Sequence, residues 1–276
     1  MTDPPAAHVI TEGLPGGPCA VLVHGLEDRW PTWTRLANRL GPAWRTVALD
    51  LPWRAGNDYG WRWVRSPADW VRSGLDAIGA GSVVLIGHSF GANAVLARLA
   101  AGEPRARAAQ LLCPLFRPDA AAVTWQTFDR ARLAFRRQIE DGIRIRLRAM
   151  AEDDIVESML ARTCERIGPM GFLTTFDEYV ASGHLPLAGV DIPVSVLVGE
   201  DDPIMFRPYA EELARRLPRS RIACWADFGH FGHLRRVDDV AGAVRALLEG
   251  PDGRPESAAP PAVRLLRDGA DGAIGA

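Results

Sequence analysis

The feature that most constrains the fold is a strand that runs into a helix through a serine framed by glycines. Residues 83–86 (Val-Val-Leu-Ile) are typical of a strand buried on both faces of a parallel sheet. Apolar residues recur at helical spacing over 94–99, so a helix follows at once. Between them, residues 87–91 (Gly-His-Ser-Phe-Gly) must turn the chain sharply, which strains the backbone at Ser89 and leaves little room at the two glycines. We predict a nucleophile elbow that presents the Ser89 hydroxyl at the edge of the sheet, above the positive end of the helix.

The pentapeptide alone is a weak signal, because glycine and serine are common in loops. The strand before it and the helix after it make the elbow the better interpretation than an ordinary turn. A hydroxyl is a poor nucleophile by itself, so this interpretation requires a base and a group that orients the base.

Composition limits the class of protein and the partners that can be expected. The 276 residues are 47% hydrophobic and 24% charged, which is ordinary for a soluble globular protein, and the net charge of −2 favours neither nucleic acid nor an anionic membrane as a partner. The four cysteines have no CxxC spacing, so we expect reduced thiols without a metal or a disulfide. No signal peptide or membrane span is indicated, and a cytoplasmic protein that needs no cofactor is the expectation.

Strand and helix patterns alternate along most of the chain, which predicts an α/β fold with a mostly parallel central sheet flanked by helices. Strands are expected at 8–10, 19–23, 45–50, 83–86, 108–112, 193–198 and 222–225. Helices are expected at 33–40, 67–78, after 91, at 206–216 and at 237–248.

The alternation stops in the middle of the chain, which indicates an inserted helical lid. We assign 1–114 and 186–249 to the two parts of the core, 115–185 to the lid and 250–276 to a disordered tail. Lid helices are expected at 126–150, 153–167 and 170–182. Residues 143–148 alternate with period two, as a strand would, but their context favours a helix.

Two later segments carry the polar groups that the elbow requires. Residues 199–202 (Gly-Glu-Asp-Asp) directly follow a buried strand, and 228–233 (Phe-Gly-His-Phe-Gly-His) follow the last strand. The carboxyl ends of parallel strands lie at one edge of the sheet, which is also the edge of Ser89. The chain order of serine, then aspartate, then histidine is the order expected after a nucleophile elbow.

At this point the sequence resembles the α/β-hydrolase superfamily over about 20–114 and 186–249. The resemblance implies Ser89 as nucleophile, Asp202 as acid and His230 as base, with Asp201 and His233 as the rival residues. It also implies an oxyanion hole made by the backbone amides of Leu26 and Phe90. His24 and His88 are expected to be structural. The motifs that carry the resemblance are His24-Gly25, 87–91, 191–194 (Asp-Ile-Pro-Val), 199–202 and Gly229-His230.

Tryptophans and arginines gather in two further regions. Trp53, Trp61 and Trp63 either pack within the core and its loops or form an aromatic wall of an apolar substrate pocket. The arginines of the lid either form a solvated surface or dock an acidic partner such as an acyl carrier protein. These arginines are Arg130, Arg132, Arg136, Arg137, Arg144, Arg146 and Arg148.

Together these features predict a serine hydrolase that cleaves an ester or thioester of a medium-to-large, largely apolar small-molecule acyl substrate through an acyl-enzyme. Two alternatives remain open. The same triad serves acyl transfer, lactone-forming cyclisation or C–C bond cleavage in related proteins, and the same fold also serves non-catalytic ligand binding.

Overall fold

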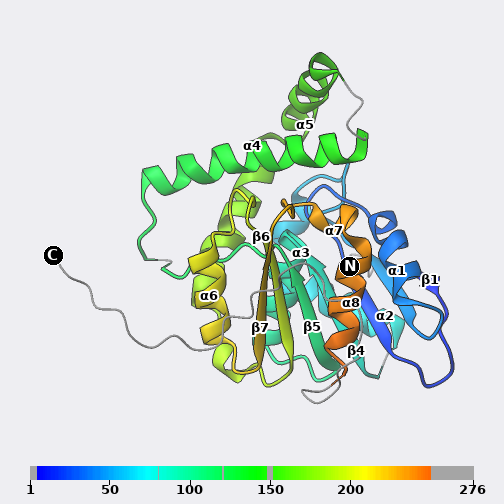
Figure 1. The fold of residues 1–276 in the computed structure, drawn as a ribbon. Helices are drawn as coiled ribbons and strands as arrows, with labels where there is room; N and C mark the ends of the chain where they lie inside the picture. The colour runs from blue at the N-terminus through cyan, green and yellow to red at the C-terminus, as the bar shows by residue number, and fades with distance from the viewer. Residues whose placement is uncertain (1–4, 80, 120, 148–151, 250–276) are drawn as a thin grey trace.

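The computed structural model describes residues 5–79, 81–119, 121–147 and 152–249. Within this part of the chain, seven strands form one sheet in the order β1-β3-β2-β4-β5-β6-β7 (Figure 1). β1 pairs antiparallel with β3, and every other pair is parallel. The strands are β1 (Ala6–Thr11), β2 (Cys19–Val23), β3 (Arg45–Asp50), β4 (Val83–His88), β5 (Ala106–Leu112), β6 (Val194–Gly199) and β7 (Ser220–Trp225).

Helices cover both faces of this sheet. The described helices outside the insert are α1 (Thr34–Leu40), α2 (Pro67–Ile78), α3 (Phe90–Ala100), α6 (Arg207–Arg216), α7 (Gly232–Arg235) and α8 (Val237–Ala246). Short 3₁₀ turns are η1 (Trp30–Trp33), η2 (Gly60–Trp63), η3 (Ser182–His184) and η4 (Leu187–Gly189).

Alternation along the strands explains the two layers of helices. In β2, Val21 and Val23 join the core under α2, α3 and α6, whereas Ala20 and Leu22 join the core under α1 and α8. Successive side chains of a strand point to opposite faces, so a strand that is apolar throughout is covered on both sides. The predicted α/β architecture is therefore confirmed, with strand and helix bounds close to those expected.

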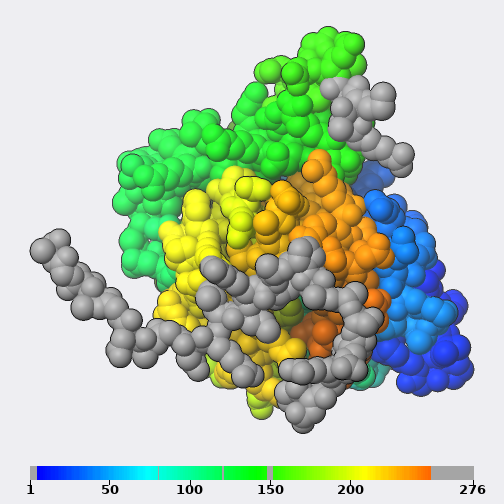
Figure 2. Space-filling view, in the orientation of Figure 1, coloured from blue at the N-terminus to red at the C-terminus, as the bar shows by residue number. Residues whose placement is uncertain are grey.

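The long helices α4 (Trp125–Leu147) and α5 (Asp153–Ala181) lie between β5 and β6 in the sequence, and we call this pair the insert. Figure 1 shows it over the carboxyl edge of the sheet, and in Figure 2 it forms a ridge above the core. α5 has a sharp break at Gly168 (φ 62°), immediately before Pro169, where the sequence predicted two separate helices. Residues 143–147 are helical, as favoured, whereas Arg148 and the predicted tail at 250–276 lie outside the described residues.

The helices of the described part of the chain give no candidate for a membrane crossing, because none combines the necessary length with the necessary apolar character.

Candidate active site

The turn between β4 and α3 has the geometry of the predicted elbow. Ser89 has φ 52° and ψ −123°, a strained conformation for a residue with a side chain. A Cβ atom on Gly87 would lie 2.7 Å from the carbonyl oxygen of Gly91, and one on Gly91 would lie 2.3 Å from that of His24. Glycine is therefore required at both positions, because backbone atoms occupy the space of a side chain.

His230 connects this serine to a carboxylate. Its Nε2 lies 2.9 Å from Ser89 Oγ, and its Nδ1 lies 2.7 Å from Asp202 Oδ2. Both His230 and Asp202 are buried. A carboxylate accepts a hydrogen bond, so the neutral imidazole carries its proton on Nδ1, and Nε2 is left to accept the proton of the serine.

Asp202 is held by the backbone of its own loop, which follows β6. Its Oδ1 accepts hydrogen bonds from the amides of Ile204 (2.9 Å) and Met205 (3.0 Å). Burial alone would raise the pKa of this carboxyl, but the facing imidazole and the two amides outweigh it, so the pKa of Asp202 is lowered. Asp202 is thus an anion, whereas its rival Asp201 is exposed.

The other histidines near the site contact the backbone and the aromatic side chains around them. His24 accepts a hydrogen bond from the amide of Leu51 at Nε2, and His88 Nε2 donates to the carbonyl oxygen of His230 (2.9 Å). Burial lowers the pKa of both. The rival base His233 is buried against Trp33 and His88, and burial lowers its pKa to about 3. His233 makes no hydrogen bond to Ser89 within the described chain.

Two backbone amides lie beside the serine. Phe90 is the first residue of α3, where a backbone N–H has no partner inside the helix, and Leu26 lines the cavity that also contains Ser89. Among the described residues, neither amide donates a hydrogen bond to another protein group. Neither amide is therefore committed to another protein group in the described part of the chain, and their role as donors to an oxyanion stays a prediction.

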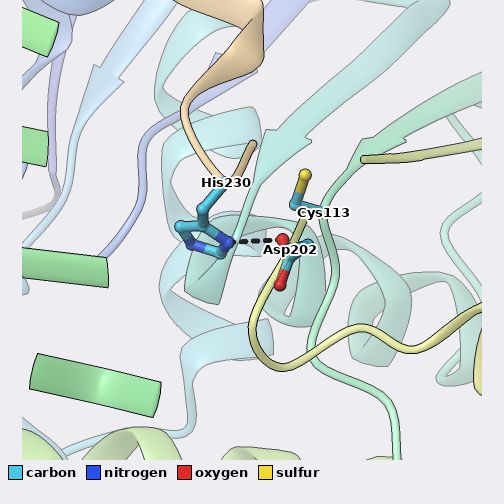
Figure 3. Close-up of side chains that lie close together, drawn as sticks. All are labelled: Cys113, Asp202 and His230. Atoms are coloured by element: carbon cyan, nitrogen blue, oxygen red, sulfur yellow. Dashed lines mark hydrogen bonds and ion pairs between the residues drawn. The ribbon is translucent and has the colours of Figure 1, made fainter. Parts of the chain in front are cut away.

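Cys113 lies beside the acid and the base, as Figure 3 shows. It follows β5 with φ 46°, and its sulfur, an oxygen of Asp202 and a ring nitrogen of His230 lie within 4.8 Å of one another. A buried Cys-Asp-His set is chemically suited to a soft divalent metal, but Asp202 and His230 are already paired with each other. Burial and the nearby carboxylate raise the pKa of the Cys113 thiol well above its ordinary value, so the thiol is protonated and packed.

A cavity of about 350 Å³ opens over Ser89 and His230. One wall is the loop of residues 26–29, Ala55 and Phe231 add to the lining, and the insert supplies the rest. The insert contributes six apolar side chains (Phe135, Ile139, Ile143, Leu147, Met159 and Ile167) together with five polar ones (Gln138, Arg146, Thr163, Arg166 and Thr175). The cavity therefore offers an apolar surface next to a polar reaction centre.

The predicted tryptophan wall is wrong for this cavity. Trp53 and Trp61 are buried in the core, where they pack against each other and against Phe90. Trp63 lies in η2 with 79% of its surface exposed. None of the three lines the cavity, because the loop that carries them turns its large rings toward α3 or into solvent. The alternative, core and loop packing, describes Trp53 and Trp61.

The insert makes three polar contacts with the site that the sequence did not indicate. Arg146 of α4 lies 3.0 Å from Asp28, and Arg166 of α5 forms an ion pair with Glu27, which also accepts a hydrogen bond from Tyr59 (2.8 Å). In the third contact, Gln138 of α4 reaches His230. The Arg-rich pattern of the lid was visible in the sequence, but nothing in it marked these partners.

Known proteins resemble this chain in sequence and in structure. A pimeloyl-[acyl-carrier protein] methyl ester esterase of Neisseria meningitidis is 24% identical over 263 residues, which cover 89% of this chain and 83% of that protein. Lipase LipV of Mycobacterium tuberculosis is 37% identical over 100 residues, 36% of this chain and 38% of the lipase. The structure of a hydrolase from Oleispira antarctica superposes with a TM-score of 0.66 at 14% identity, covering 88% of this chain and 94% of that one.

The profile of the alpha/beta hydrolase family spans the elbow, the acid and the base together. It matches residues 20–243, which take in the whole parallel part of the sheet and the insert between its halves. The chain therefore belongs to the alpha/beta hydrolase family.

Proposed function

We propose that this hydrolase is a serine esterase that cleaves esters or thioesters with a largely apolar acyl group. The observation that carries the proposal is the hydrogen-bonded series from Asp202 through His230 to Ser89, which ends at the apolar cavity. The esterase and lipase activities in the names of the two relatives support it.

The proposed reaction begins when Ser89 Oγ attacks the acyl carbon while its proton moves to His230 Nε2. The carbonyl oxygen becomes an anion, which the amides of Leu26 and Phe90 stabilise, and Asp202 stabilises the imidazolium. His230 then returns the proton to the leaving alkoxide or thiolate as the bond from the acyl carbon breaks. A water molecule attacks the acyl-enzyme by the same path, its proton passes through His230 to Ser89, and the free acid leaves.

Covalent labelling tests the nucleophile. A fluorophosphonate probe is expected to modify the wild-type protein, and Ser89→Ala is expected to lose both labelling and at least about 10⁴-fold in turnover. A series of p-nitrophenyl esters from acetate to decanoate then measures the acyl preference, which we expect to lie at medium chain length. Labelling that persists in Ser89→Ala, or a preference for very small charged acyl groups, would contradict the proposal.

Isotopically labelled water separates hydrolysis from acyl transfer and from cyclisation. Hydrolysis places one labelled oxygen in the carboxylic acid product, whereas acyl transfer and cyclisation give products without it. We expect the label in the acid.

A second proposal concerns how the acyl group is delivered. The exposed arginines of α4, with the acyl-carrier-protein ester in the name of the Neisseria relative, favour an acidic carrier as the partner. Several of these arginines already face acids, for example Arg136 and Glu157 at 3.5 Å, so the expected attraction is moderate. If this proposal holds, added salt should lower kcat/KM for a carrier-bound ester and leave that for a free ester unchanged.

A further inference from the structure

We propose that Gln138, a residue of the insert, is a positioning residue for His230, so that α4 completes the catalytic site instead of only covering it. The inference rests on the proposed function, because it assigns His230 the role of the base. Gln138 Nε2 lies 3.1 Å from His230 Nδ1, the nitrogen that also faces Asp202.

The packing of α4 explains why this side chain reaches the histidine. Ala134, Gln138 and Gly142 are buried and follow one another at four-residue intervals, so they form one stripe along the helix. A Cβ atom on Gly142 would lie 3.0 Å from the ring of Phe231, the residue next to His230. The small residues Ala134 and Gly142, at the two ends of the stripe, let α4 approach the segment that carries His230 and Phe231. The glutamine between them extends into the site.

Burial of this amide requires a polar partner. Gln138 is 6% exposed and lies among apolar residues that line the cavity. Burying an amide without a hydrogen bond is unfavourable. Within the described residues, His230 is the one polar group that hydrogen-bonds to the Gln138 side chain. The contact therefore gives this buried amide the polar partner that it requires.

The proton on Nδ1 decides which end of the amide faces it. Nδ1 donates to Asp202 and has no lone pair left to accept a second hydrogen bond. The oxygen and nitrogen of a glutamine amide are assigned from such networks, so the chemistry places Oε1 toward Nδ1–H. In this orientation Gln138 shares the proton with Asp202, fixes the plane of the ring, and directs a negative dipole end at the imidazolium that forms during attack.

The other titratable and charged groups around His230 define the background of this effect. They are Asp202 after β6, Cys113 after β5, His88 at the end of β4, His233 in α7, and Asp141 and Arg146 on α4. Burial keeps both neighbouring histidines neutral, because it lowers their pKa values. Gln138 is uncharged, so replacing it with a charged or an apolar residue changes the field at His230 in a known direction.

The test is the pH dependence of kcat/KM for p-nitrophenyl butyrate in two variants. Gln138→Glu places a carboxylate against the imidazolium and should move the acid limb up by about one pH unit. Gln138→Met removes the acceptor, so we expect the limb to move down, with a loss of about tenfold carried by kcat and not by KM. Gln126→Met, the same change at an exposed position of the same helix, should leave both parameters unchanged.

Two further measurements separate the possible outcomes. If Ser89→Ala is inactive but both Gln138 variants retain the wild-type pH profile and kcat, the positioning role is wrong and the proposed function stands. If Ser89→Ala remains active, the proposed function itself fails. A purely structural role would lower the melting temperature of the Gln138 variants without moving the acid limb, and that result would also overturn the inference.

Discussion

Glu178 is a half-buried carboxyl whose ionisation should make the stability of the fold depend on pH. It lies in α5, beside a cavity of about 130 Å³ between the start of α2 and the end of the insert. Among the described residues, no donor makes a hydrogen bond to its carboxyl group. Burial and the neighbouring Asp177 raise its pKa to about 7, against an ordinary value of 4.5, and Arg62 offsets only part of this effect.

The size and the sign of the effect follow from this shift. The difference of about 2.5 units corresponds to roughly 3 kcal/mol, at about 1.4 kcal/mol per unit. Below pH 4.5 the carboxyl is protonated in both the folded and the unfolded chain, and no cost arises. Between pH 4.5 and 7 the unfolded chain releases the proton first, so the free energy of unfolding falls as pH rises. Above pH 7 the full cost is present.

The perturbation is Glu178→Gln, which keeps the shape and removes the charge. We expect the variant to match the wild type at pH 4.5 and to exceed it by about 3 kcal/mol at pH 8. For a chain of this size that is an increase of roughly 6–12 °C in melting temperature. Calorimetry or urea unfolding at pH 4.5, 6, 7 and 8 measures the difference.

A matched variant on the same helix controls for the substitution itself. Glu165 is exposed, so Glu165→Gln should change stability little and by the same amount at every pH. The reasoning is refuted if the difference between Glu178→Gln and the wild type is constant from pH 4.5 to pH 8, or if Glu165→Gln shows the same pH dependence.

Three further experiments test the site and the structure around it. Gly91→Ala forces a Cβ atom to 2.3 Å from a backbone oxygen at the end of β2, so it should destabilise the protein by about 3 kcal/mol or more in urea unfolding. The control is Gly242→Ala in α8, where a Cβ atom would meet no other atom within 4 Å. This variant should be neutral or stabilising by about 0.5–1 kcal/mol. Asp202→Asn should lower kcat by about 10⁴-fold in an ester assay, because the wrong tautomer of the base is then favoured. A double-mutant cycle of Arg146→Met and Asp28→Asn should give a coupling of about 0.2–1 kcal/mol from melting curves, because both partners retain contact with water.

Local patterns were sufficient to predict most of the sheet and the residues at its carboxyl edge. Strands such as 19–23 and 45–50 have the predicted bounds, because their apolar runs are interrupted by turn residues on both sides. Residues placed directly after such strands lie at one edge of a parallel sheet, so chain order and topology predicted a serine, an aspartate and a histidine at that edge. The family resemblance, and not topology, selected Asp202 over Asp201 and His230 over His233.

The tryptophan loop shows where local patterns are insufficient. Trp53 and Trp63 belong to one irregular segment without periodicity, so the sequence does not determine which face of the loop each ring occupies. The structure places Trp53 in the core and Trp63 in solvent. The same limit applies to Gln138, because a polar residue in an Arg-rich helix is indistinguishable from a solvated one until the helix is docked on the core.

The contacts of the docked insert with the site lead to a prediction about kcat. Arg146 and Arg166 each contact an acid in the loop that follows Leu26, while Gln138 contacts the base. If the insert only enclosed the acyl group, weakening its contacts would raise KM and leave kcat intact. Because the two arginines hold the loop that follows Leu26, the proposed oxyanion donor, removing both together should lower kcat, even for an acetate ester that does not extend along the apolar wall. A change in KM alone would show that the insert acts on binding and not on the reacting groups.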